Sequence, residues 1–171
     1  IFDVEELPTH GGSLRVFGCL EQAVHEKQAQ VGAILAEERA RGMETLLFYS
    51  AFQPRADAVK DGLLNFLLQV KDDGKTVAGY GAAAKGNTLL NYAGIRPDLL
   101  PFICDAAPAK QNKFMPGSHI PIFAPEKLAE NRPDYVLILP WNIASEVRSQ
   151  WAKLEEMGTY FVVAVPETKI L

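Results

Sequence analysis

The stretch Thr76–Leu90, TVAGYGAAAKGNTLL, decides the fold that the sequence predicts. A β-prone run leads into a Gly-x-Gly turn, and small residues then open a helical segment, which is typical of a Rossmann-like domain. Gly79, Gly81 and Ala84 fit the pattern G-x-G-x-x-A. Gly79 permits a tight turn and Gly81 lets the backbone approach a ligand, while the helix N-terminus directs free N–H groups at an anion.

Charged and amide side chains in and after this stretch favour a phosphate-bearing ligand. Lys85 brings a mobile positive charge to the ligand-facing end of the predicted sheet, and Asn87 brings a hydrogen-bonding amide. Asp105 ends the next apolar run, PFICD, where an acidic residue meets ribose hydroxyls in dinucleotide-binding domains. A purely structural interpretation stays open here, because small residues also let a strand and a helix pack closely.

Apolar β-prone runs alternate with helical segments through the rest of residues 75–171. The runs are PFICD, HIPIF, DYVLIL and YFVVAV. Nearly continuous apolar strands separated by helices predict a parallel sheet with helices on both faces. Residues 75–171 are therefore predicted to form a Rossmann-like α/β domain.

Two further polar clusters follow predicted strands, at the sheet edge where open α/β sheets bind ligands. Lys110 lies in the long polar connection after Asp105, and Trp141 and Asn142 follow YVLIL. Glu146 lies one helical turn beyond Asn142, so both can face one crevice. An aromatic ring beside polar groups suits a base or sugar. Solvated lysines in a loop and a tryptophan that caps the core are the structural alternatives.

Residues 1–74 have a different pattern of apolar and polar residues. IFDVEEL and LRVFG predict two strands joined by the Gly-rich segment PTHGGS. Apolar periodicity predicts helices over Leu20–Arg41 and Asp57–Lys71, and Pro54 is expected to kink or break any helix that passes through it. Residues 19–74 are therefore predicted to be a helical connector.

Composition argues against several classes of partner. The chain has 171 residues, with 17 Lys and Arg against 21 Asp and Glu, so its net charge of −4 recruits neither nucleic acid nor an anionic membrane. No apolar run reaches the roughly 18 residues of a membrane span. Cys19 and Cys104 are far apart and fit no metal-binding pattern, and two reduced thiols favour a cytoplasmic protein.

Four motifs together are similar to one family. In order, they are ELPTHGGSLRVF, GYGAAAKGNTLLNYAGI, CDAAPAKQNKFMPGSHIPI and LPWN…E. They resemble the C-terminal part of S-adenosylmethionine-dependent C-methyltransferases, including those that methylate a ring carbon of nucleotide-linked deoxysugars. In that family a zinc-binding domain and an S-adenosylmethionine-binding domain precede a Rossmann-like domain that helps to hold the sugar nucleotide.

The resemblance implies different roles for different parts of the chain. Residues 1–18 would be the last strands of an upstream methyltransferase domain, and residues 75–171 would bind a nucleotide sugar. S-adenosylmethionine would be bound by that upstream domain of the full-length enzyme, and no cofactor by this chain. Because the zinc cysteines and the catalytic segment of the family are missing here, the chain is expected to be catalytically incomplete by itself.

The resemblance also revises the interpretation of the glycine loop. Lys85-Gly86-Asn87 matches a GA-x-x-KG pattern of a family that uses no nicotinamide, which directs the loop at a diphosphate or a sugar. His10 would lie near the cleft of the intact enzyme, where it contacts substrate or hydrogen-bonds its own loop. The candidate substrate-binding residues are His10, Gly79, Gly81, Lys85, Gly86, Asn87, Asp105, Lys110, Trp141, Asn142 and Glu146.

Two other functions remain open at the level of sequence. Gly79, Gly81, Ala84 and Asp105 are also compatible with a nucleotide-binding domain of an NAD(P)-dependent oxidoreductase. The third possibility is a non-catalytic module that binds a nucleotide or another protein.

Overall fold

The computed structural model describes residues 1–9 and 12–171, which divide into two compact units, Ile1–Arg55 and Ala56–Leu171. His10, one of the predicted substrate-binding residues, lies outside the described residues. The mixed α/β architecture predicted from the sequence is confirmed, with a separate antiparallel strand pair in the first unit and a mostly parallel sheet in the second.

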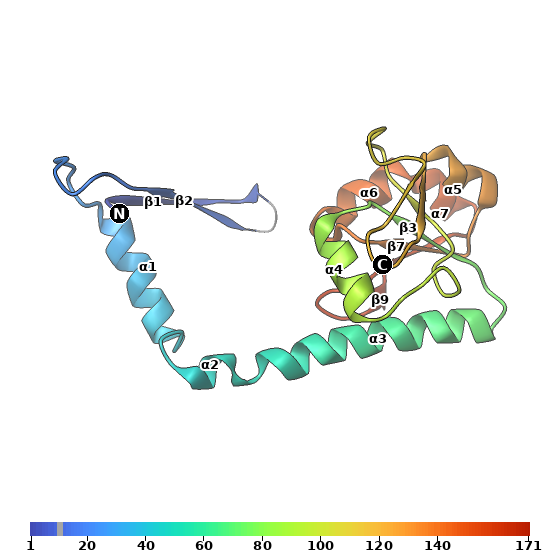
Figure 1. The fold of residues 1–171 in the computed structure, drawn as a ribbon, viewed down its shortest axis with the longest axis horizontal. Helices are drawn as coiled ribbons and strands as arrows, with labels where there is room; N and C mark the ends of the chain where they lie inside the picture. Colours follow the sequence, from blue (N-terminus) through green and yellow to red (C-terminus); the bar gives the residue numbers. More distant parts are fainter. Residues whose placement is uncertain (10–11) are drawn as a thin grey trace. The chain divides into compact units, whose positions relative to one another are not determined.

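The first unit is a β-hairpin with a helix beside it, drawn in blue in Figure 1. Strands β1 (Asp3–Leu7) and β2 (Ser13–Phe17) pair antiparallel, as predicted. Helix α1 (Ala29–Ala40) contacts β1, and the short helix α2 (Leu46–Ser50) follows it. Val4 and Val31 are the buried hydrophobic residues among the described residues of this unit. Its core is therefore very small.

Both predicted connector helices have different bounds from those expected. The helix predicted over Leu20–Arg41 begins only at Ala29, because Leu20 and Val24 find nothing to pack against and are 79% and 99% exposed. Helix α3 (Phe52–Asp72) begins before the predicted Asp57. Pro54 does not break it, since a proline in the first turn removes an N–H that has no partner within the helix.

The second unit is built on a seven-stranded sheet in the order β5-β6-β4-β3-β7-β8-β9. Strands β6, β4, β3, β7 and β8 are parallel, and the two edge strands β5 and β9 are antiparallel to their neighbours. The bounds are β3 Val77–Tyr80, β4 Ile103–Cys104, β5 Lys113–Phe114, β6 Pro121–Phe123, β7 Tyr135–Ile138, β8 Tyr160–Val163 and β9 Lys169–Ile170. The strands β4 and β6 lie on one side of β3, and β7 and β8 lie on its other side. This reversal of strand order at β3 is the Rossmann arrangement that the sequence predicts.

Helices cover both faces of this sheet, as predicted. Besides α3 they are α4 (Ala84–Tyr92), α5 (Glu126–Asn131), the 3₁₀ turn η2 (Trp141–Ile143), α6 (Ala144–Gln150) and α7 (Ala152–Glu156). The helical stretch after β7 is divided into three short pieces, with a break at Trp151, whose φ of −110° and ψ of 23° are not helical.

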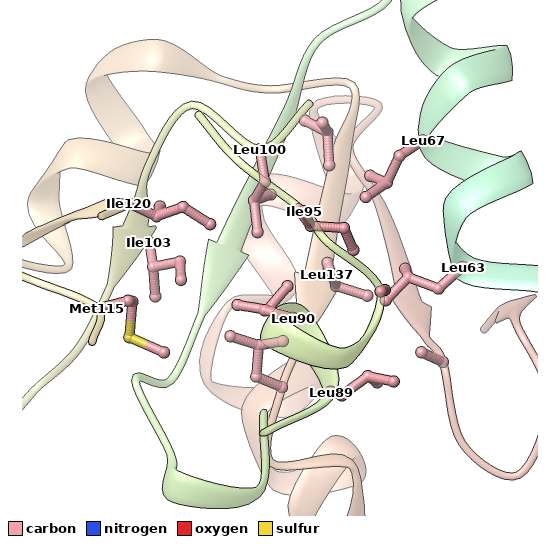
Figure 2. Packing of buried hydrophobic residues seen from close by; sticks show 14 of the residues in the cluster. Leu63, Leu67, Leu89, Leu90, Ile95, Leu100, Ile103, Met115, Ile120 and Leu137 are labelled. Atoms are coloured by element: carbon pink, nitrogen blue, oxygen red, sulfur yellow. The ribbon is translucent and has the colours of Figure 1, made fainter. Parts of the chain in front are cut away.

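Two buried clusters hold the layers together. Figure 2 shows the first, in which Leu63 and Leu67 of α3 meet Leu89 and Leu90 of α4 above Leu137 of the sheet. The second cluster joins the opposite face of the sheet to α5, α6 and α7 through residues such as Leu128, Val147 and Leu154. Strand β3 serves both clusters, because its side chains alternate between the faces.

Candidate functional site

Asp105 fixes the loop that follows β3. Its carboxylate accepts hydrogen bonds from the backbone N–H of Ala82 at 2.7 Å and of Ala107 at 2.8 Å. The ammonium of Lys110 lies 3.0 Å from the same carboxylate, and Asp105 is only 7% exposed. The sequence predicts Asp105 at the position where an acidic residue meets ribose hydroxyls in dinucleotide-binding domains. In the structure its carboxylate ties the glycine loop to the connection after β4.

The glycines of the loop are required by packing. A Cβ on Gly79 would lie 2.7 Å from Ile103, one on Gly81 would lie 2.5 Å from Pro140, and one on Gly86 would lie 2.6 Å from Leu139. Gly81 also has a φ of +85°, which favours glycine. The chain segment that follows β7 therefore fills the space on that side of the loop. Gly81 and Gly86 let the loop and α4 lie close to the segment after β7, and Gly79 lets β3 lie close to Ile103 of β4.

Lys85 of α4 contacts two other residues that the sequence predicts to bind substrate, Trp141 and Asn142. Its ammonium donates a hydrogen bond to Oδ1 of Asn142 and lies 4.6 Å from the ring centroid of Trp141. A lysine held over an aromatic face gains a cation–π attraction. The sequence thus identified three side chains that the fold does bring together, from the ends of β3 and β7. Glu146 is exposed and accepts a hydrogen bond from Ser145.

Helix α4 begins without a side-chain cap. Its N-cap residue is Ala83, flanked by Ala82 and Ala84, and within residues 1–9 and 12–171 the N-cap has no side-chain hydrogen bond. Serine, threonine, aspartate or asparagine is usual at this position, and alanine costs about 1 kcal/mol of helix stability. The uncapped first-turn N–H groups and the positive end of the helix dipole favour an anionic ligand.

A pocket of about 670 Å³ opens beside this helix start, on the side away from Lys85. Its polar lining comes from Asn87 and Thr88 of α4 and from Lys110 and Lys113. Its apolar lining is Ala82, Ala83, Ala84, Ala109, Phe114, Met115, Pro116 and Ile122. Lys113, together with Lys110 that is paired with Asp105, brings positive charge to the pocket beside the helix start. Lys113, which the candidate set omitted, lies in the polar connection that the sequence had marked as functional.

That connection is a hairpin rather than an open loop. Strand β5 pairs with β6. Asn112 and His119 adopt positive φ values of 59° and 58°, and no simple sequence pattern predicts this conformation. Asn91 of α4 donates a hydrogen bond to the carbonyl of Pro116 at 2.9 Å, and Arg96 donates one to the carbonyl of Gly117. The wall of the pocket is therefore anchored to α4 at its far end.

Other reactive groups in the described residues do not form a second chemical centre. Burial raises the pKa of the Cys104 thiol to about 12, so this thiol stays protonated and is a poor nucleophile. Within residues 1–9 and 12–171, no three His, Cys, Asp or Glu side chains gather as metal ligands. None of the helices in this part of the chain combines the length and apolar character needed to cross a membrane.

Comparison with known proteins agrees with the sequence motifs. Residues 8–166 match the family described as the C-methyltransferase C-terminal domain. The chain belongs to this family. It is also 39% identical, over all of its 171 residues, to the C-methyltransferase NovU of Streptomyces niveus, and it spans 41% of the length of that relative. The resemblance inferred from the four motifs is thereby confirmed.

Proposed function

We propose that this chain is the substrate-binding part of an S-adenosylmethionine-dependent C-methyltransferase, and that it holds a nucleotide-linked sugar by its phosphates. Membership of the C-methyltransferase family and the 39% identity to NovU support the reaction class. The observation that carries the binding role is the pocket of about 670 Å³ at the uncapped start of α4.

The positive groups of the pocket suit a diphosphate. Lys113 forms no ion pair with any carboxylate of the described residues, whereas Lys110 shares its charge with Asp105. An ammonium without a carboxylate partner is available for a charge-assisted hydrogen bond to a phosphate oxygen. The helix start adds backbone N–H donors to the same pocket. We therefore assign the diphosphate to Lys113, Lys110 and the first turn of α4.

Lys85, Trp141 and Asn142 have a different place in this proposal. They do not line the pocket, and the Lys85 ammonium is already engaged by the amide and the ring. These three side chains remain candidates for contact with the sugar end of the substrate. In the alternative structural role, they hold α4 against the segment after β7.

The same pocket does not suit S-adenosylmethionine. Its sulfonium is a cation, and two lysines and the positive end of a helix dipole repel a cation. A dinucleotide is also disfavoured, because Asp105 is committed to two backbone N–H groups and Lys110, and Pro140 and Leu139 fill the other side of the loop. We therefore place the cofactor of the complete enzyme on an upstream methyltransferase domain.

Calorimetric titration of the 171-residue chain with dTDP, NADH and S-adenosylmethionine tests the proposal. We expect dTDP to bind most tightly, and Lys113→Ala to weaken it about tenfold, since a charge-assisted hydrogen bond contributes about 1.5–3 kcal/mol. Lys153→Ala is the matched control, because this exposed lysine of α7 does not line the pocket. Tighter binding of NADH than of dTDP would instead favour an oxidoreductase domain, and equal weakening by both variants would exclude a specific role for Lys113.

A further inference from the structure

Phe114 is an exposed aromatic side chain at a polar pocket. It is 63% exposed, although a phenylalanine gains free energy when it leaves water. It lines the pocket together with Lys110 and Lys113, and it follows Lys113 directly in strand β5. These three residues therefore line one cavity.

The position of Phe114 is fixed by the hairpin. Its cross-strand partner is Pro121, and the next residue, Met115, is 2% exposed and belongs to the core cluster. Figure 2 shows the Met115 side chain pointing into the core next to Ile103. The backbone N–H of Met115 donates a hydrogen bond to the carbonyl of Ile120 at 2.8 Å. The backbone that carries the exposed ring is thus held by the pairing of β5 with β6 and by the buried side chain of Met115.

We propose that Phe114 is the surface on which the base of the nucleotide stacks. This inference rests on the proposed function, in which Lys110 and Lys113 hold the phosphates. A flat aromatic face beside phosphate-binding cations matches the chemistry of a nucleoside diphosphate, whereas a sugar phosphate without a base has no π face to offer the ring.

Stacking on a phenylalanine has a consequence for specificity. Every base has a π face, and a phenylalanine ring has no hydrogen-bonding group with which to distinguish one base edge from another. Phe114 therefore supplies affinity for nucleotides in general. Its removal should weaken dTDP and UDP to a similar extent and leave inorganic pyrophosphate unaffected.

Titration of the 171-residue chain with dTDP, UDP and inorganic pyrophosphate tests the proposal. Phe114→Leu should raise the dissociation constants of dTDP and UDP about tenfold, because base–aromatic stacking accounts for that order of affinity. Pyrophosphate should bind as before. Phe114→Tyr keeps the aromatic face and should restore nucleotide binding. Tyr160→Leu is the matched control, since Tyr160 is 55% exposed on β8 and does not line the pocket.

The outcomes distinguish this inference from the proposed function. Unchanged dTDP binding by Phe114→Leu, with weakened binding by Lys113→Ala, overturns the stacking role alone and leaves the phosphate site in place. Equal weakening of dTDP and pyrophosphate by Phe114→Leu also overturns it, because the ring then acts on the shape of the phosphate site. If Lys113→Ala changes neither ligand, the proposed function itself fails.

Discussion

Gly86 shows how a single hydrogen in place of a methyl group positions α4. A Cβ at this position would lie 2.6 Å from the Cβ of Leu139, closer than side chains approach in folded proteins. The sequence associated Gly86 with a ligand-binding pattern, and the structure supplies a sufficient packing reason for it. The contact between Gly86 and Leu139 cannot be predicted from one sequence, because the two residues are 53 positions apart along the chain.

Replacing Gly86 by alanine is expected to destabilise the second unit by about 1–2 kcal/mol. Overpacking costs about 1–3 kcal/mol, and the better helix propensity of alanine returns up to about 1 kcal/mol. Urea unfolding followed by circular dichroism measures the difference. Gly62→Ala in α3 is the control, because the nearest atom to its Cβ is the Thr168 hydroxyl oxygen at 3.3 Å. A loss no larger than that of Gly62→Ala would contradict the packing explanation.

Asp105 illustrates what sequence reasoning does and does not resolve at a single residue. Its position at the end of β4, on the carboxyl edge of the sheet, follows from the apolar run before it. Its partners do not, because they include backbone N–H groups of two different loops. Lys113 was recognised only as one of the lysines of the polar connection, because the two-residue strand on which it lies has no recognisable pattern.

At the scale of elements, one carboxylate joins the starts of β3 and β7. Asp134 accepts hydrogen bonds from the backbone N–H and the hydroxyl of Thr76, both at 2.8 Å, and from Lys75 at 3.2 Å. The backbone N–H of Thr76 is the largest cause that lowers the pKa of Asp134 below its ordinary value of 3.8. The contribution of Asp134 to stability is therefore complete above pH 3.8 and is lost as the pH falls through its lowered pKa.

Asp134→Asn should accordingly destabilise the second unit at pH 7 by about 1 kcal/mol, a low value because the side chain is partly exposed. As the pH falls through the lowered pKa of Asp134, the difference from the wild-type chain should shrink, since the wild-type carboxylate becomes protonated too. Unfolding curves at pH 7 and at a series of acidic pH values measure this. Asp98→Asn is the control, because Asp98 pairs only loosely with Lys71, at 3.5 Å and with both side chains exposed. A difference that stays constant with pH would refute the assignment.

The strands and helices that the sequence predicted correctly are those with a strong apolar pattern. Each of the five parallel strands lies within an apolar run of the sequence, and the strand residues are largely buried on both faces of the sheet. The errors concern helix ends and the β5–β6 hairpin. Leu20 and Val24 have the spacing of an amphipathic face, but both side chains are exposed in the part of the chain that the structure describes. Left-handed residues such as Asn112 and His119 make the hairpin, and neither residue type requires that conformation.

At the scale of the whole molecule, the two units differ in how much apolar surface they bury. Val4 and Val31 are the buried hydrophobic residues of the described part of Ile1–Arg55, whereas the second unit has two extensive clusters. Nearly all of the buried hydrophobic residues lie in Ala56–Leu171. The assignment of residues 1–18 to the end of a methyltransferase domain remains a prediction.

Hydrogen exchange should reveal this difference directly. We expect backbone amides of β1 and β2 to exchange much faster than those of β3 and β7 in the 171-residue chain, because little buried area opposes local opening of the hairpin. Mass spectrometry of peptides from Asp3–Leu7 and Tyr135–Ile138 measures the two rates. Equal protection in a chain shown to be monomeric would contradict the expectation. Peptides from the exposed segment 20–28 serve as the fast-exchanging reference.

The edges of the seven-stranded sheet have a consequence for aggregation. Strands β5 and β9 are each two residues long, and each begins with a lysine, Lys113 and Lys169. Short, charged edge strands offer a poor template for pairing with the strand of another molecule. The strands of the β1–β2 hairpin are five residues long, so they offer a longer template, although β1 carries Asp3, Glu5 and Glu6. Intermolecular β-pairing at high protein concentration should therefore begin at the hairpin. The edge strands of the seven-stranded sheet should not pair with other molecules.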